Sequence, residues 1–149
     1  MITEINTLAP VKGAADAEID AAPELVWDVL TALESWPSWN PDIRSIAVDS
    51  SLREGTTFRW KAGPATITST VRDVDAPRRI AWTGKTLGIR AVHVYRFEAR
   101  EGTTLVQTEE SYDGLVARLF RGLFQKTLDR ALESGLAHLK TEAERRTAP

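Results

Sequence analysis

The last third of the chain restricts the fold most, because no proline occurs between residues 115 and 143. Leucines recur there at helical spacing from Leu115 to Leu139, and Phe120 and Phe124 widen the apolar stripe. This pattern predicts one amphipathic helix, on the order of 40 Å long at about 1.5 Å per residue. A helix of that length needs a large apolar surface to pack against.

The residues before this helix supply such a surface. From residue 43 onward apolar and polar residues alternate, and short turn signals such as Gly63-Pro64 and Glu101-Gly102 separate the segments. Alternation predicts strands, and short turns between successive strands predict antiparallel pairing. The expected strands cover residues 15–21, 43–48, 57–62, 65–75, 79–84, 89–99 and 104–112.

A helix interrupts the strands near the start of the chain. Pro23 suits the first turn of a helix, because the N–H that proline lacks would have no partner there. Leu25, Val26, Val29 and Leu30 then recur at helical spacing. The Trp-rich turn at residues 36–41 follows, and we expect it to close one end of the core.

The order of elements predicts an α+β fold. A curved antiparallel β-sheet of about seven strands wraps around the long C-terminal helix, and two short helices follow the first strand. We expect an N-terminal arm at residues 1–12, a single domain at 13–146 and a tail at 147–149.

Composition narrows the range of partners. The 149 residues carry a formal net charge of −2, which argues against nucleic acid or an anionic membrane surface as partner. No apolar run approaches the roughly 20 residues of a membrane span, and residues 1–12 lack the pattern of a signal peptide. The absence of Cys excludes disulfides and thiolate metal sites and fits a reducing cytoplasm, where we expect the protein.

Strand alternation also predicts which side chains face the interior. On residues 89–99, Arg96 and Glu98 are expected to face water, which turns His93, Tyr95 and Phe97 inward.

The pairing of the next strand depends on the length of the hairpin loop. A loop at residues 100–102 places Phe97 opposite Leu105, and it turns Gln107 inward opposite Tyr95 and Glu109 inward opposite His93. A loop one residue longer or shorter reverses the second strand. The inward residues are then Val106, Thr108 and Glu110.

Aromatic and aliphatic residues dominate the predicted interior wall, which is typical of a pocket for a flat or greasy small molecule. The predicted ligand-binding residues are Trp39, Phe58, Trp60, Ile67, Val71, Trp82, His93, Tyr95, Phe97, Gln107 and Leu123. The catalytic candidates are His93, Tyr95 and Glu109, because an imidazole beside a carboxylate can move a proton. The more ordinary interpretation is structural, with a hydrogen-bonded buried His and an aromatic core.

Other chemistries lack their motifs. Two His and no Cys leave little for a transition-metal site, and the chain has no His-Glu-x-x-His, Gly-x-Ser-x-Gly or phosphate-loop pattern. We therefore expect neither a metal nor a cofactor.

Four segments together resemble a known superfamily. They are IDAAPELVWDVL at residues 19–30, WPSWNP at 36–41, GTTL at 102–105 and ESYDG at 110–114. The chain is similar, from about residue 14 to residue 144, to the START-like (SRPBCC) superfamily in its polyketide cyclase/dehydrase-type branch. The resemblance implies the helix-grip fold. It leaves function open, because members include lipid and hormone carriers, aromatic cyclases and co-chaperone-type domains.

Three functions follow as hypotheses. The first is binding of a lipid, an isoprenoid or a polyketide-like aromatic between the sheet and the C-terminal helix. The second is a cyclase or dehydratase that uses acid/base residues in the same cavity. The third is a protein-interaction or stress-related domain with a filled cavity. Phe120 and Phe124 cannot both face the core beside the leucine stripe, so one is expected to be exposed and available to build a homodimer.

Overall fold

The structure is a computed structural model that describes residues 2–148. Seven strands form one antiparallel sheet in the order β1-β7-β6-β5-β4-β3-β2. The strands are β1 (Val11–Ile19), β2 (Ile43–Val48), β3 (Thr57–Ala62), β4 (Ala65–Asp75), β5 (Arg79–Thr86), β6 (Ile89–Arg100) and β7 (Thr103–Asp113). The helices are α1 (Pro23–Thr31), a 3-10 turn (Leu33–Ser35), α2 (Trp36–Trp39), α3 (Leu115–Leu119) and α4 (Arg121–Thr147). The predicted α+β helix-grip architecture is confirmed.

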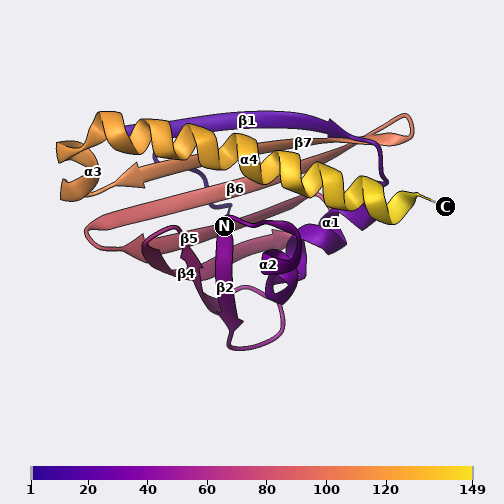
Figure 1. Ribbon diagram of the computed structural model, residues 1–149, viewed down its shortest axis with the longest axis horizontal. Coiled ribbons are helices and arrows are strands. Elements are labelled where there is room, and N and C mark those ends of the chain that lie inside the picture. Colours follow the sequence, from indigo (N-terminus) through magenta and orange to yellow (C-terminus); the bar gives the residue numbers. More distant parts are fainter. Residues whose placement is uncertain (1, 149) are drawn as a thin grey trace.

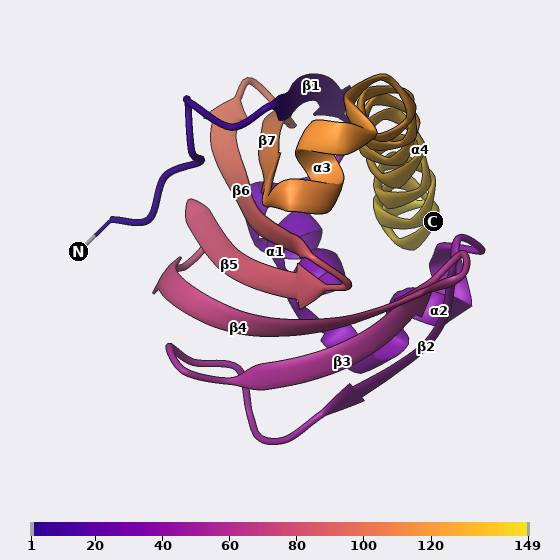
Figure 2. The same ribbon diagram turned by 90° about the vertical axis from the view of Figure 1, so that its left-hand side faces the viewer.

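The sheet is strongly curved and encloses the long helix on one side. Figure 1 shows α4 running along β1 and β7, and Figure 2 shows the sheet curling from β1 beside α4 round to β2 beside α2. The first strand, β1, is therefore the edge strand of the sheet that packs against α4.

Contact between β1 and α4 is tight because of a glycine. A Cβ added at Gly13 would lie 3.0 Å from Leu132 Cδ1 and 3.2 Å from Leu128 Cγ. Both leucines are buried with Val11 in a small apolar cluster between strand and helix. Gly13 thus lets the helix approach the strand backbone more closely than a side chain would permit.

Replacing Gly13 by valine is expected to lower the free energy of unfolding by about 1 to 3 kcal/mol, because the added methyl groups overpack this contact. Ala14→Val is the matched control, since Ala14 is exposed on the other face of β1. We expect the control to change stability by less than about 0.5 kcal/mol. Urea unfolding of both variants measures the difference. Equal losses would show that the strand, and not its contact with α4, responds to the larger side chain.

The prediction of one uninterrupted C-terminal helix was wrong at one residue. Phe120 has φ −118° and ψ 38°, which breaks the helix between α3 and α4. The break lets α3 turn back over the ends of β6 and β7 while α4 continues along β1 (Figure 2).

The Trp-rich segment forms α2 and closes one end of the core, as expected. Trp36 is buried and its indole N–H donates to the Leu30 carbonyl at 2.8 Å. Its ring packs edge-on against Phe58 and Trp60 at centroid distances of 5.7 and 5.5 Å. The paired aromatic edges and faces stabilise this end of the interior.

The residues before β1 lie against the outer face of the sheet, and β1 begins at Val11, within the segment expected to be an arm. The Thr3 N–H donates to Asp73, the Asn6 N–H donates to the Ser111 hydroxyl, and Arg79 donates to the Thr3 carbonyl. Glu4 forms an ion pair with Arg96 at 2.8 Å. Within residues 2–148, no helix is long and apolar enough to cross a membrane.

Candidate functional site

The β6–β7 register decides which polar side chains enter the interior. Arg100 pairs with Thr103, so the hairpin loop consists of two residues, Glu101 and Gly102. The expected three-residue loop at residues 100–102, and the strand pairing that it implies, are therefore wrong by one position. The structure has the other pairing, in which Val106, Thr108 and Glu110 face the interior. In this register the inner-face pairs are Phe97 with Val106, Tyr95 with Thr108, and His93 with Glu110.

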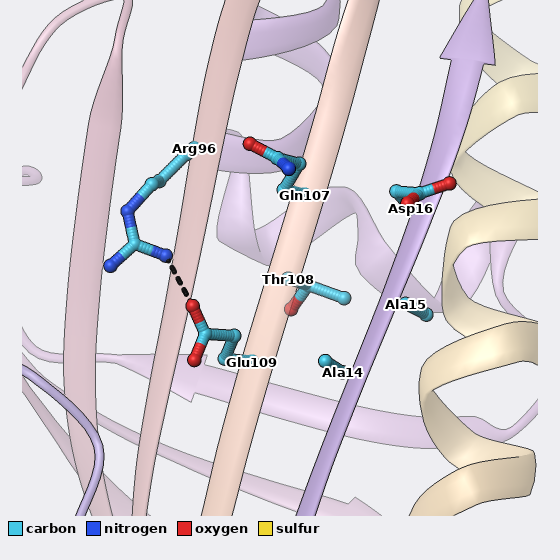
Figure 3. Close-up of a pocket in the computed structure, with 7 residues that line it drawn as sticks. All are labelled: Ala14, Ala15, Asp16, Arg96, Gln107, Thr108 and Glu109. Atoms are coloured by element: carbon cyan, nitrogen blue, oxygen red, sulfur yellow. Dashed lines mark hydrogen bonds and ion pairs between the residues drawn. The ribbon is translucent and has the colours of Figure 1, made fainter.

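Gln107 and Glu109 consequently face outward, which corrects their predicted place in the interior. Glu109 forms an ion pair with Arg96 at 2.7 Å. Both residues line a surface hollow of about 380 Å³ on the outer face, together with Arg96 and residues of β1 (Figure 3). The carboxylate beside the interior imidazole belongs to Glu110.

His93 begins a hydrogen-bonded chain on the inner face, which runs through Thr108 to Val94. Its Nε2 is 2.8 Å from the Thr108 hydroxyl, and that hydroxyl donates to the Val94 carbonyl at 3.1 Å. The single hydroxyl hydrogen of Thr108 is thereby used, so we assign the hydrogen between the two side chains to Nε2. The lone pair of His93 Nδ1 then faces Glu110 Oε1 at 3.4 Å.

Burial sets the protonation of this pair. Loss of water raises the pKa of Glu110 to about 8 and lowers the pKa of His93 to about 3. Both shifts favour the neutral forms, which matches the hydrogen positions assigned above. In these neutral forms Nε2 donates to Thr108, and the Glu110 carboxyl lies beside the lone pair of Nδ1. Burial also raises the pKa of Tyr95 and of Tyr112, and the charge of Glu110 adds to both shifts.

Aromatic rings hold the imidazole in place. His93 stacks on Tyr95 at a centroid distance of 4.7 Å, and Trp82 approaches His93 at 5.0 Å. Tyr95 in turn stacks on Phe97 at 6.4 Å. The Tyr95 hydroxyl reaches across to α4, where a Cβ at Gly135 would lie 3.9 Å from it. Tyr95 therefore spans the interior from sheet to helix.

Six of the other predicted ligand-binding residues are buried or partly exposed. Phe58, Val71 and Trp82 are buried in the core, and Trp39, Trp60 and Ile67 are partly exposed. Trp60 donates its indole N–H to the Ser69 hydroxyl at 3.1 Å, whereas the indole N–H of Trp39 lacks a partner among residues 2–148.

Leu123 does not belong with them, because its side chain is 63% exposed on the first turn of α4. The helix break at Phe120 rotates this turn away from the interior, which the uninterrupted apolar stripe did not reveal.

The pairing expected from a three-residue loop did not place Glu110, Thr108 and Tyr112 in the interior. All three have the same parity on β7, so the two-residue turn at Glu101-Gly102 was the signal that places them inside. Within residues 2–148 no group of three or more acidic or His side chains is arranged to hold a metal ion.

Strand order, sheet curvature and the enclosed α4 define a protein of the START-like helix-grip class. The chain matches the model of the family described as polyketide cyclase / dehydrase and lipid transport over residues 10–144. It belongs to this family. No curated protein sequence matches the chain.

Solved structures with this fold are distant in sequence. The ZhuI aromatase/cyclase from Streptomyces sp. R1128 is 17% identical, with a TM-score of 0.83 over 92% of this chain and 95% of that one. A START superfamily protein from Mycobacterium smegmatis is 15% identical, with a TM-score of 0.79 over 90% and 97%. A protein from Thermus thermophilus is 21% identical, with a TM-score of 0.80 over 92% and 99%.

Proposed function

We propose that this protein binds a hydrophobic small molecule carrying one hydrogen-bonding group, between the sheet and α4. The single observation that carries the proposal is the carboxyl of Glu110, which is 12% exposed and lies beside His93 near the aromatic rings of the inner face. A polar group enclosed by apolar walls fixes the orientation of a ligand while the walls supply most of the affinity.

The ligand classes that suit this interior are lipids, isoprenoids and polyketide-like aromatics. Trp60, which is partly exposed, offers a flat apolar surface, and protonated Glu110 offers a donor to a carbonyl or hydroxyl group. The family description, which names lipid transport, supports the same classes. We propose the cytoplasm as the place of action, because the Cys-free composition suits a reducing compartment.

Ligand binding is tested with the purified full chain and a panel of fatty acids, isoprenoid alcohols and polyphenols. We expect a one-to-one complex in native mass spectrometry and a rise in melting temperature for at least one class. Glu110→Leu is expected to weaken binding of a ligand with a polar group roughly tenfold, because a buried hydrogen bond is lost. Glu109→Leu on the outer face is the matched control. No complex with any class would overturn the proposal.

A second candidate function is acid/base catalysis of a cyclisation or dehydration. It is favoured by the cluster of Glu110, His93 and Thr108, in which Glu110 holds a proton to give to a carbonyl oxygen and His93 lies beside it. The likeness to an aromatase/cyclase supports this candidate at the level of fold. The catalytic pair would be His93 with Glu110, in place of His93 with Glu109.

Product analysis with a poly-β-ketone substrate separates the two functions. If catalysis occurs, His93→Ala is expected to slow turnover by roughly 10² to 10⁴, the usual contribution of a positioned acid or base. Unchanged turnover in His93→Ala and in Glu110→Gln would remove both residues from the chemistry. Absence of any cyclised or dehydrated product from the parent chain would leave ligand binding as the function.

A further inference from the structure

Five large apolar side chains are exposed together at the end of the molecule that carries α3. They project from the β5–β6 turn, α3 and the first turn of α4 and are 55% to 90% exposed, and we call them the apolar cap: Leu87, Leu115, Leu119, Phe120 and Leu123. Exposed apolar residues scattered singly are ordinary, but a contiguous group marks an interaction surface.

The cap is continuous because its two parts touch. A Cβ at Gly88 would lie 2.6 Å from Val116 Cγ2, and one at Gly114 would lie 2.3 Å from the Gly88 carbonyl oxygen. The turn that carries Leu87 therefore packs directly against the start of α3. Figure 2 shows α3 and the β5–β6 end facing the same side of the molecule.

Cations surround these apolar residues. Arg118 and Arg121 alternate with them in sequence, and Lys85 and Arg90 flank Leu87 on the paired strands; all four are exposed. Asp113 is the carboxylate next to them, and it lies 3.4 Å from Arg90 and 3.5 Å from Arg118. The overall net charge of −2 therefore conceals a local excess of positive charge.

We propose that the apolar cap docks on an anionic lipid membrane. Leu119 and Phe120 enter the boundary between headgroups and acyl chains, while Arg118 and Arg121 bind lipid phosphates. This combination of protruding apolar residues and interleaved cations suits a bilayer surface. The proposal differs from the expectation that net charge gave, which disfavoured an anionic membrane, because it rests on the charge of this end of the molecule alone.

A second copy of the chain is a poorer occupant. A two-fold symmetric interface joins the same patch on both subunits, so it would bring Arg118 and Arg121 of one copy toward the same cations of the other. The inference goes beyond the proposed interior ligand and does not depend on it.

The test is flotation of the full chain with vesicles of phosphatidylcholine alone and with roughly one third phosphatidylserine. We expect binding to the anionic vesicles, weaker binding to the neutral ones, and loss of binding as salt is raised. Arg118→Glu together with Arg121→Glu is expected to reduce the partition coefficient at least roughly twentyfold, and Leu119→Ser with Phe120→Ser at least roughly tenfold.

Matched controls are Leu8→Ser and Arg53→Glu, which alter exposed residues outside the cap. Circular dichroism and melting temperature establish that each variant is folded, and sedimentation without vesicles establishes whether the chain self-associates. Docking is overturned if anionic vesicles do not bind, if the controls lose as much binding as the cap variants, or if the cap variants instead abolish a dimer. Interior ligand binding by the cap variants is measured separately in solution, so failure of docking and failure of ligand binding are distinguishable.

Discussion

Replacing Gly114 by alanine is expected to lower the free energy of unfolding by roughly 3 to 5 kcal/mol. Gly114 has φ 112° and ψ 169°, a backbone region that is essentially restricted to glycine. A Cβ there would also lie 2.3 Å from the Gly88 carbonyl oxygen, which is a backbone atom and cannot swing aside. Strain and collision therefore add at the point where β7 passes into α3. Urea unfolding of the variant measures the loss.

Gly102→Ala separates the two contributions. Gly102 has φ 74° in the β6–β7 turn, and an added Cβ there would meet nothing within 4 Å. This control carries backbone strain alone and is expected to lose about 1 kcal/mol. If Gly114→Ala loses no more than Gly102→Ala, the contact between the β5–β6 turn and the start of α3 is not what fixes this junction.

The second large effect is a decline in stability above about pH 6.5, caused by Glu110. Between about pH 6.5 and 8 the unfolded chain has lost the Glu110 proton, while the raised pKa of Glu110 keeps that proton on the folded chain. Folding then takes up a proton, so stability falls as the pH rises, by about 1 kcal/mol per pH unit.

His93 produces the opposite limb at low pH. Its pKa is lowered to about 3 by burial, so between about pH 3 and 4.5 the unfolded chain holds a proton on His93 that the folded chain does not. Stability therefore falls as the pH falls in that window. Between about pH 4.5 and 6.5 the two contributions cancel, and we expect a plateau of maximum stability there.

Glu110→Gln is expected to remove the decline above pH 6.5, because glutamine keeps the shape of the protonated carboxyl and does not titrate. Above pH 8 the variant should be more stable than the parent chain by roughly 2 to 4 kcal/mol. Glu109→Gln, one residue away on the outer face, should keep the parental profile. Urea unfolding across about pH 5 to 9 measures all three proteins. A profile altered by Glu109→Gln and not by Glu110→Gln would contradict the observed register.

Much of this architecture could be predicted from the order of periodic segments. The bounds of β2, β3 and β4 agree with those predicted, because Gly and Pro turns end these strands sharply. The interior carboxylate could not be fixed in the same way. A hairpin loop of two residues or three differs by one position, and each choice turns a different glutamate of the Glu109-Glu110 pair inward.

The C-terminal helix shows a second limit of sequence periodicity. Leu115, Leu119 and Leu123 continue the apolar stripe of α4, yet all three are exposed. A stripe predicts a buried face only while the helix stays straight, and the break at Phe120 depends on packing against the ends of β6 and β7. These three leucines, whose burial was predicted wrongly, belong to the apolar cap.

The pairing of β1 with β7 has a consequence for how the chain acquires its structure. Val11 pairs with Tyr112, so about a hundred residues must be synthesised between β1 and the strand with which it pairs. Pairings so distant in sequence close late and slowly. On a ribosome the β2–β6 meander emerges first and must persist with its aromatic face open until β7 and α4 arrive. Chaperone demand during synthesis is therefore expected to peak before residues 103–147 have left the ribosome, because β7 and α4 complete the cover that α1 and α2 begin.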